Sequence, residues 1–321
     1  MRFLIKTALL SCISTSIFSQ NNSLSQLFYP NITMSARAYS GANIGIGANN
    51  DEYSLTRKSI SGFVPIRSEV QVGIGFRKKF DIKAVHTALA VNIAQNEPQI
   101  SNTVANTGFK TVSLSVIQMQ ASVRERLWVY GGGVGFTESN ETFFAPQPFF
   151  WGGASRMRVL GLHTQILYGS AIVYNQKFRL IPVFGFNKKT GKDWRFSGLL
   201  PFQASVNKKF NEWFNLEAGA SIKGYSAGYK LDIGAEKVPR KENYQHLNLS
   251  LSANAHLLKA FNLSIEGGYA TSRTLNTFNA VNEKITKIEP KAGPYIGASV
   301  RYITSKSKFS SKFLNKMGIG L

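Results

Sequence analysis

The sequence predicts an all-β protein, a single transmembrane antiparallel β-barrel of about 12 strands (10–14). Three observations predict this fold. Apolar and polar residues alternate along many segments, the N-terminus has the features of an export signal, and the mean hydropathy of −0.10 is too low for a helical membrane protein. Only alternate residues of a barrel strand meet lipid, which accounts for such an average.

The alternation is clearest at 247–257, where every odd position is apolar and every even position is polar. Side chains point to opposite faces along a strand, so one face of this segment is apolar and the other is polar. The same alternation recurs at 194–206 and 261–270. Segments of about 10 residues exceed the usual soluble strand of about 5–6 and match a tilted membrane-spanning strand.

Residues 1–19 have the features of a secretory signal peptide, with positive charge from Arg2 and Lys6, a short apolar stretch, and Ser19 at the cleavage position. An uncleaved amphipathic N-terminus is one alternative, and a lipoprotein box ending at Cys12 is another. Cleavage after Ser19 removes Cys12, the only cysteine, and so excludes disulfides and thiol chemistry from the mature chain. We therefore expect export to the cell outer membrane.

No linker, fixed-period repeat or low-complexity block divides the chain. We expect an N-terminal periplasmic segment at 20–31, the outer-membrane β-barrel at 32–304 and a basic C-terminal tail at 305–321. The apolar residues of that tail have helical spacing. A short basic helix on a membrane surface and a disordered basic tail are both compatible with this spacing.

Turn residues and changes of phase delimit the expected strands. At 110–123 the apolar phase changes, which predicts a β-bulge near Val116. The glycines at 131–135 lack the lysine and the helix of a phosphate loop, so we expect them to allow a strand to bend. The expected strands lie at 32–47, 53–64, 70–76, 85–93, 110–123, 128–136, 162–174, 178–186, 194–206, 214–222, 247–257, 261–270 and 295–302.

Aromatic residues make up 12% of the chain, and several gather near expected strand ends. One group, at 143–151, contains four phenylalanines and Trp151, and a second contains Trp213 and Phe214. Such rings fit the aromatic girdles that barrels place at both membrane interfaces. Core aromatics of a soluble β-sandwich are the alternative.

The formal charge of +21 falls to +19 once Arg2 and Lys6 are removed, and so basic a chain could bind nucleic acid. Its basic residues are spread over expected turns, such as 77–79, 188–192 and 237–241. An exported chain has little access to chromosomal DNA. We therefore expect its partners to be outer-membrane lipid and lipopolysaccharide, with the barrel assembly machinery, and no nucleic acid. Solvated loops are the alternative for part of these clusters.

The central part of the chain resembles an uncharacterised family of outer-membrane barrels common in Bacteroidetes, a domain of unknown function (DUF6268). The order of its motifs is similar over roughly 143–302 and looser before that, although 63–66 is also similar. The resemblance implies the fold and the outer-membrane location, and it implies no substrate. The motifs that carry it are Phe-Phe-Trp-Gly-Gly at 149–153, Phe-Arg-Leu-Ile-Pro-Val-Phe-Gly-Phe at 178–186, Trp-Arg-Phe-Ser-Gly-Leu-Leu-Pro at 194–201 and Gly-Tyr-Ser-Ala-Gly-Tyr-Lys-Leu at 224–231.

Catalytic signals are weak. His86, His163, His246 and His256 stand on different expected strands without metal-ligand spacing, and the chain has no G-x-S-x-G elbow. His163 and His256 fall in the polar phase, which points away from lipid and argues against catalysis on lipids. We expect no catalytic residue, no cofactor and no metal, and we expect that the protein is not an enzyme.

The polar phase of the expected strands supplies candidates for the lining of the lumen. Ion pairs that merely fill a narrow barrel are the alternative role for the charged ones. The candidate lumen-lining residues are Arg195, Gln203, Glu217, Lys223, Asn248, Asn254, His256, Glu266 and Arg301.

Three classes of function stay open. The first is passive passage of small solutes, for which three lumen cations against two carboxylates and the basic turns favour anions. The second is a closed structural or binding barrel without transport, and the third and weakest is an outer-membrane enzyme. About 12 strands do not decide between the first two, because about eight leave room only for side chains and sixteen or more leave an aqueous channel.

Overall fold

The computed structural model describes residues 30–44, 51–74, 80–101, 108–122, 126–139, 146–161, 163–175, 177–233, 236–257 and 260–303. The predicted signal peptide 1–19, most of the segment 20–31 and the tail 305–321 lie outside these residues. None of the described residues belongs to a helix long and apolar enough to cross a membrane. The strands are β1 (Asn31–Asn43), β2 (Glu52–Ile74), β3 (Phe80–Ile100), β4 (Phe109–Ser122), β5 (Arg126–Ser139), β6 (Gln147–Gly161), β7 (Thr164–Asn175), β8 (Lys177–Thr190), β9 (Trp194–Leu200), β10 (Gln203–Lys209), β11 (Phe214–Ile233), β12 (Glu236–Leu257), β13 (Phe261–Phe278), β14 (Lys284–Ile288) and β15 (Gly293–Ile303).

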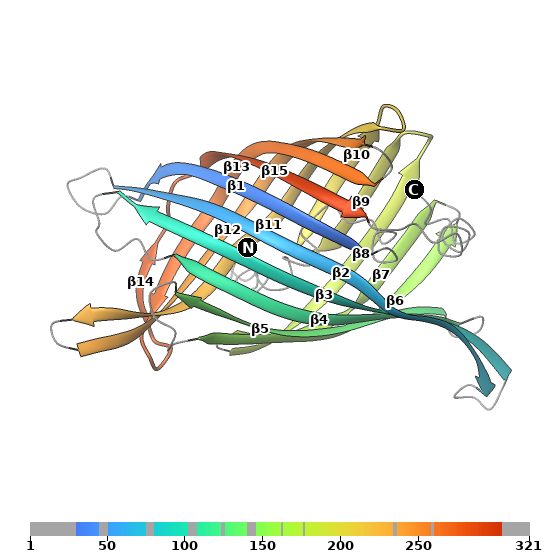
Figure 1. Cartoon of the computed structure of the whole chain (residues 1–321), viewed down its shortest axis with the longest axis horizontal. Helices are drawn as coiled ribbons and strands as arrows, with labels where there is room; N and C mark the ends of the chain where they lie inside the picture. The colour runs from blue at the N-terminus through green and yellow to red at the C-terminus, as the bar shows by residue number, and fades with distance from the viewer. Residues whose placement is uncertain are drawn as a thin grey trace.

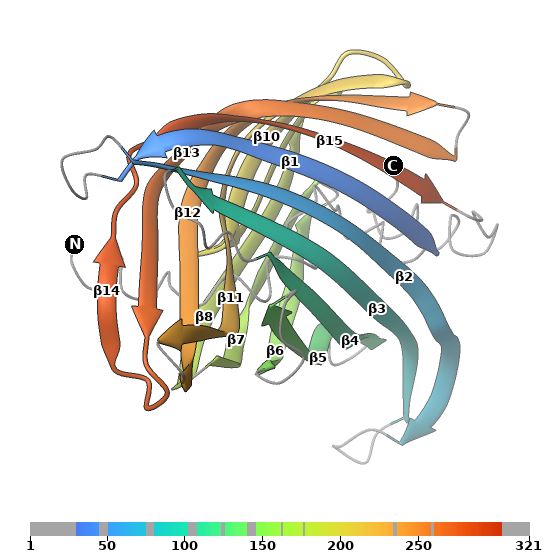
Figure 2. The same cartoon turned by 60° about the vertical axis from the view of Figure 1, so that its left-hand side comes forward.

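The strands close into one antiparallel barrel (Figures 1 and 2). Each strand from β1 to β13 pairs with the next, β13 pairs with β15, and β15 pairs with β1 from Asn31↔Ile303 to Tyr39↔Tyr295. The closed wall thus has 14 strands, β1–β13 and β15, and β14 is added beside β13. The prediction of an all-β barrel is confirmed, and the 14 strands of the wall lie above the predicted central value of about 12 and at the upper limit of the predicted range of 10–14.

Three differences in strand boundaries explain the count. The segments predicted at 53–64 and 70–76 are one strand, β2, whose register shifts between Pro65 and Arg67. The segment predicted at 194–206 is two short strands, β9 and β10, because the chain turns at 201–202. The prediction also missed β6, whose run of aromatic and glycine residues hides the alternation.

The outer face of the wall is apolar, as a membrane-spanning barrel requires. Leu249 and Leu251 on β12, and Ile296 and Val300 on β15, are exposed at alternate positions. Aromatic rings gather near both ends of the strands. Phe150, Tyr174 and Phe178 pack together with ring centroids 4.7–5.5 Å apart, and at the opposite end the ring of Phe261 lies 4.8 Å from that of Tyr302.

Two predictions about apolar positions are wrong, and both failures have the same cause. β4 pairs with β3 and β5 without a register shift, so no bulge lies near Val116. Ile117 on β4 is buried inside the barrel, as are Phe149 and Trp151, which were predicted to belong to a girdle. The inner face of β4 to β8 is itself apolar, so an apolar residue there does not mark the lipid face.

The barrel has two unlike rims. At the terminal rim, where β1 begins and β15 ends, the connections between strands are two to five residues long. At the loop rim, opposite, β7–β8 and β11–β12 are joined by one and two residues, whereas the connections β1–β2, β3–β4 and β5–β6 span seven or eight residues and β13 and β15 are joined through β14. Short turns lie on the periplasmic side of outer-membrane barrels and longer loops on the outside.

β11 changes its surroundings along its length. Near the terminal rim its faces alternate, with Glu217 buried and Ala218 exposed, whereas all six residues at 223–228 are buried. Gly228 pairs in parallel with Glu138 of β5, and the Ser226 Oγ donates to the Asn175 Oδ1 at 3.4 Å. The half of β11 toward the loop rim has therefore left the wall and crosses the inside of the barrel toward β5.

Candidate functional site: the lumen cavity and its closed mouth

A cavity of about 810 Å³ occupies the lumen. It reaches the terminal rim, where Asp193 and Trp213 in the short turns line it, and it extends inward to Lys223 and Tyr295. All nine residues proposed from the sequence as lumen-lining contribute to its lining: Arg195, Gln203, Glu217, Lys223, Asn248, Asn254, His256, Glu266 and Arg301.

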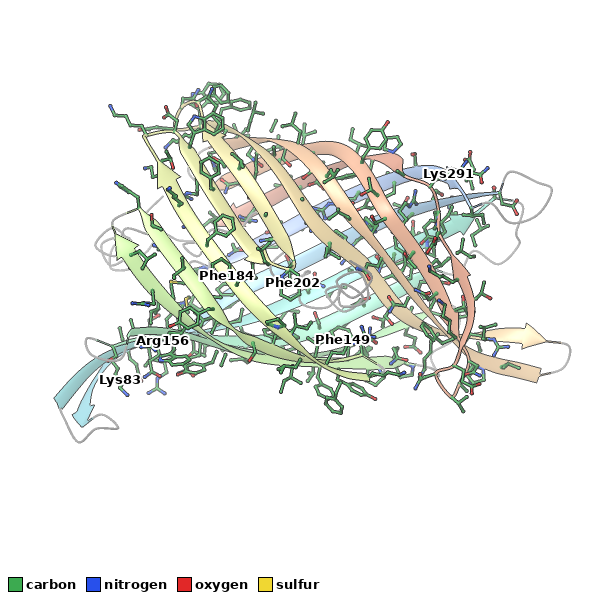
Figure 3. All side chains as sticks on the ribbon, turned by 180° about the vertical axis from the view of Figure 1, so that it is seen from behind. Lys83, Phe149, Arg156, Phe184, Phe202 and Lys291 are labelled. Carbon is green, nitrogen blue, oxygen red and sulfur yellow. The ribbon has the colours of Figure 1, made fainter. Side chains whose placement is uncertain are left out.

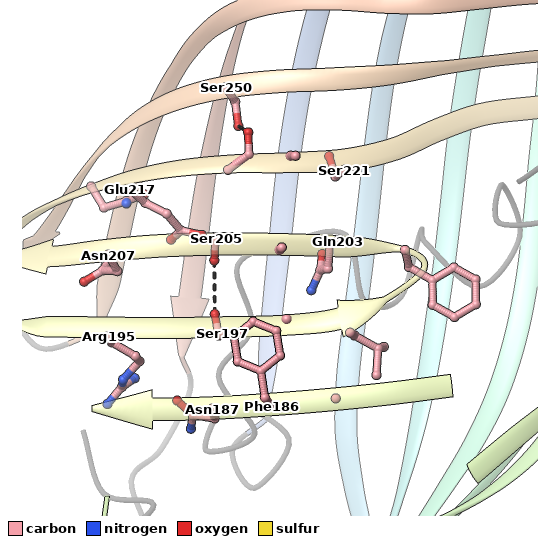
Figure 4. A pocket seen from close by; sticks show the side chains of 18 of the residues that line it. Phe186, Asn187, Arg195, Ser197, Gln203, Ser205, Asn207, Glu217, Ser221 and Ser250 are labelled. Atoms are coloured by element: carbon pink, nitrogen blue, oxygen red, sulfur yellow. Dashed lines mark hydrogen bonds between the residues drawn. The ribbon is translucent and has the colours of Figure 1, made fainter. Parts of the chain in front are cut away.

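One wall of this cavity, formed by β9 to β13, is polar and internally hydrogen-bonded. The amide of Asn215 links three neighbours, since its Oδ1 accepts from Asn207 at 2.7 Å and from Asn254 at 2.9 Å, and its Nδ2 lies 3.0 Å from the Nε2 of His256. The hydroxyls of Ser197 and Ser205 lie 3.0 Å apart across β9 and β10 (Figure 4). These bonds hold the polar side chains flat against the strands and leave space in the lumen.

The charges of the cavity form two groups. Near the terminal rim, Glu217 interacts electrostatically with Arg195 and Arg301. Deeper in the lumen, Arg37 of β1 forms an ion pair with Glu266 of β13, and Lys223 lies in the field of both. Among the described lining residues, seven Lys and Arg stand against four Asp and Glu, so the cavity carries an excess of positive charge.

The facing wall, formed by β4 to β9, is apolar. Its lining includes Ile117, Trp151, Val183, Leu199 and Phe202.

The glycines of β5 make this wall possible. A Cβ atom at Gly131 would lie 2.9 Å from the ring of Trp151, and one at Gly133 would lie 2.6 Å from its Nε1. These glycines were predicted to bend the strand; the structure shows that they make room for the inward indole ring.

Toward the loop rim the cavity is closed by contacts between β2 in the wall and the half of β11 that crosses the barrel. The hydroxyls of Tyr53 on β2 and Tyr225 on β11 lie 3.1 Å apart, and Tyr225 also donates to the Glu242 carboxylate. The Arg57 Nη1 donates to the backbone carbonyl of Gly224 at 3.0 Å. In the order of the wall, β12, β13, β15 and β1 separate β11 from β2, so these bonds tie the crossing half of β11 to a distant part of the wall.

Buried aromatic rings pack together beside these contacts, and we call the set the aromatic plug. Tyr39 stacks on Tyr295 at 5.0 Å, Tyr53 lies 4.9 Å from Tyr244, and Arg273 lies over both of the latter rings. The Arg273 Nε also donates to the Tyr244 hydroxyl at 2.9 Å. The aromatic plug consists of Tyr39, Tyr53, Phe109, Tyr225, Tyr244 and Tyr295.

Sequence reasoning found the polar lining and missed the plug. Asn248 shows the boundary between them, since it lines the cavity yet is only 1% exposed and donates to the Tyr39 hydroxyl at 3.1 Å. The signal for the plug was present in the sequence. Tyr225 shares the phase of Glu217 and Lys223, and Tyr244 shares the phase of Asn248, so both tyrosines occupy inward positions.

The four histidines were predicted to stand on different strands, but His246 and His256 both lie on β12, and His163 lies in the turn before β7. His86, His246 and His256 take part in local hydrogen bonds or ring contacts. The Nδ1 of His86 lies 2.7 Å from the Ser68 hydroxyl, and the ring of His246 packs against Tyr39 and Tyr244. Within the described ranges, no three His, Cys, Asp or Glu side chains come together as metal ligands.

Comparisons with known proteins give one family match and several similar solved structures. A family model described as "Domain of unknown function (DUF6268)" matches residues 168–303. No curated protein is similar to the chain. Three similar solved structures are a Pseudomonas putida F1 COG4313 outer membrane channel (9% identity, 86% of this chain and 95% of that chain, TM-score 0.40), the transport unit of the Escherichia coli autotransporter AIDA-I (10%, 87% and 90%, 0.30) and the P. putida toluene transporter TodX (9%, 92% and 92%, 0.25).

Proposed function

We propose that the protein is an outer-membrane channel for small anionic solutes and that the conformation described above is its closed state. The terminal rim, with its short turns, is the periplasmic side in this proposal. Solutes reach the cavity through that rim, and the aromatic plug blocks the way to the outside. The observation that carries the proposal is a positively lined cavity that opens at one rim and is shut at the other by non-covalent contacts.

The charge of the lining supports anions over cations. Seven basic side chains against four acidic ones raise the electrostatic potential in the cavity, and rings of Arg or Lys select anions in pores. Arg195 and Arg301 both interact with a single carboxylate, that of Glu217. These three side chains lie between the terminal rim and the plug. They are therefore placed where a permeating anion would be attracted.

Planar-bilayer recordings of the full-length protein test this proposal. Tyr225→Ala removes a ring and a hydroxyl from the centre of the plug, and we expect it to conduct more often than the wild type. Reversal potentials in a salt gradient should show anion preference, and Arg195→Glu in the Tyr225→Ala background should reduce it. Cation preference in Tyr225→Ala would contradict the charge argument.

A closed binding barrel is the second candidate, and the contacts across the lumen favour it. Tyr53 and Arg57 bond to the crossing half of β11, and Arg273 donates to the backbone carbonyl of Tyr53, so hydrogen bonds tie this cross-section together. If neither the wild type nor Tyr225→Ala conducts, although both remain folded barrels on unboiled gels, this second function replaces the first.

A further inference from the structure

The wall of the barrel is broken between β8 and β11. β8 pairs with β9 only from Phe184 to Thr190, so the residues at 177–183 bond to β7 alone. β11 pairs with β10 only as far as Ser221, and beyond that point it follows β12 and crosses toward β5. The hairpin of β9 and β10, with seven residues in each strand, is too short to fill the space between them.

Both ends of this break are fixed by hydrogen bonds. At one end the backbone N–H of Ile222 donates to the carbonyl of Phe202 at 2.9 Å, which ties the tip of the β9–β10 hairpin to β11. At the other end Ser226 bonds to Asn175, beside the β7–β8 connection. Figure 3 shows this side of the barrel, with Phe202 at the tip of the hairpin and Phe184 on the neighbouring β8.

On the outer surface of the barrel, the residues beside the break are apolar and include a group of aromatic side chains. Residues 177–183 of β8 pair with β7 on one side only. Within them Phe178 and Leu180 are each 67% exposed, and Phe178 packs against Phe150 and Tyr174. Pro182, also on this length, lacks the N–H that a neighbouring strand would need, and proline in sheets is found at edges. The edge is therefore built into the sequence, and it meets lipid.

The inside of the break joins an apolar surface to a basic one. Ile181, Val183 and Phe202 are buried in one cluster with Trp151, and Phe202 is only 4% exposed. Lys223 lines the cavity. It is the next residue after Ile222, whose backbone N–H donates to the Phe202 carbonyl. An apolar surface that ends at a lysine complements a molecule with a long apolar chain and a single negative head.

We propose that this break is a lateral portal for single-chain amphipathic anions of the fatty-acid type. Their apolar chain lies along Val183 and Phe202 between the lumen and the lipid, and their carboxylate faces Lys223. A lateral path lets the chain pass between two apolar surroundings without entering water or crossing the aromatic plug. The proposal rests on the proposed channel function and narrows its substrate class.

Photolabelling of the full-length protein in lipid vesicles tests the portal. The probe is hexadecanoate with a photoreactive diazirine near its methyl end, and the labelled residues are read by mass spectrometry. We expect labels to concentrate on β8 and on the β9–β10 turn. Val183→Trp should reduce this labelling about tenfold, the effect of losing about 1.4 kcal/mol of binding, whereas Val300→Trp on the lipid face of β15 should not.

The head-group assignment has its own probe, the matching diazirine hexadecanol, which is neutral. The wild type should be labelled about tenfold more by the carboxylate than by the alcohol, because a hydrogen bond between charged groups is stronger than one that involves a neutral hydroxyl. Lys223→Gln should abolish this preference, and Lys223→Arg should restore it. Migration on unboiled gels confirms that each variant is folded.

Two results would overturn the inference. Labels spread evenly around the lipid face would contradict the portal, and equal labelling by acid and alcohol would contradict the anionic head. Neither result depends on conductance. Anion-selective currents without portal labelling would reject the portal alone, and portal labelling without currents would reject the proposed channel alone.

Discussion

The two halves of β11 keep the same alternation of inward and outward side chains, but the half near the terminal rim lies in the wall and the half near the loop rim lies inside the barrel. In the first half Glu217 faces the cavity and Ala218 faces lipid, and the strand pairs with both wall neighbours. In the second half Tyr225 and Ser226 are both buried, because the strand has left the wall. The comparison teaches that one strand can line the cavity and close it.

The difference follows from residue size. The outward side chains of the crossing half are small: they belong to Gly224, Ser226 and Gly228. They leave room for this half of β11 to lie under the wall strands that it contacts, β5 and β7. On its inward phase Tyr225 fills the cross-section and bonds to Tyr53. The break in the wall is the other result of the crossing, since β8 loses the neighbour that it would have had.

The largest expected effect tests whether the wall has distinct lipid and cavity faces. It is measured on β12, which pairs with the whole length of β11. Leu251→Arg places a charge on the exposed lipid face and should destabilise the barrel by about 2–4 kcal/mol. Asn254→Arg, on the cavity face of the same strand, should cost much less. Denaturant unfolding in lipid vesicles measures both. Equal losses would mean that the two faces are not distinct.

A smaller effect separates the two halves of β11 directly. Ser226→Leu overpacks a buried position and removes the bond to Asn175, so we expect a loss of roughly 1–3 kcal/mol. Ala218→Leu, in the same phase of the same strand, adds an apolar group to the lipid face and should be nearly neutral. The same unfolding assay applies. A Ser226→Leu variant as stable as Ala218→Leu would place the whole of β11 in the wall.

The sequence was sufficient for the fold and for the polar lining, because alternation reports which side chains share a face. Arg195, Glu217 and Glu266 were identified in this way, and they line the cavity. Alternation failed where both faces are apolar, as at Ile117, and where both are buried, as at 223–228. A two-residue period cannot report what lies against a face, so the plug and the break in the wall became visible only in the structure.

The same limit applies to tolerance. A lumen-facing position is permissive only where the lumen is open, as around Asn254. Asn248 faces inward yet is buried and bonds to Tyr39, so a large charged residue should not be accommodated there. Position along the strand therefore matters as much as phase.

The central claim is that the loop-rim half of β11 crosses the barrel to β5, and a disulfide tests it most directly. Gly228 and Glu138 are paired residues, and paired residues have Cα atoms within the range that a disulfide spans. Cys12 is the only natural cysteine and lies in the predicted signal peptide, so the double variant Gly228→Cys, Glu138→Cys has few competing thiols. We expect rapid disulfide formation under mild oxidation. The control, Gly228→Cys with Val134→Cys, moves the β5 partner four residues, or about 13 Å, along the strand and should not crosslink. Failure of the paired variant to crosslink in a folded barrel, or equal crosslinking of the control, would contradict the crossing.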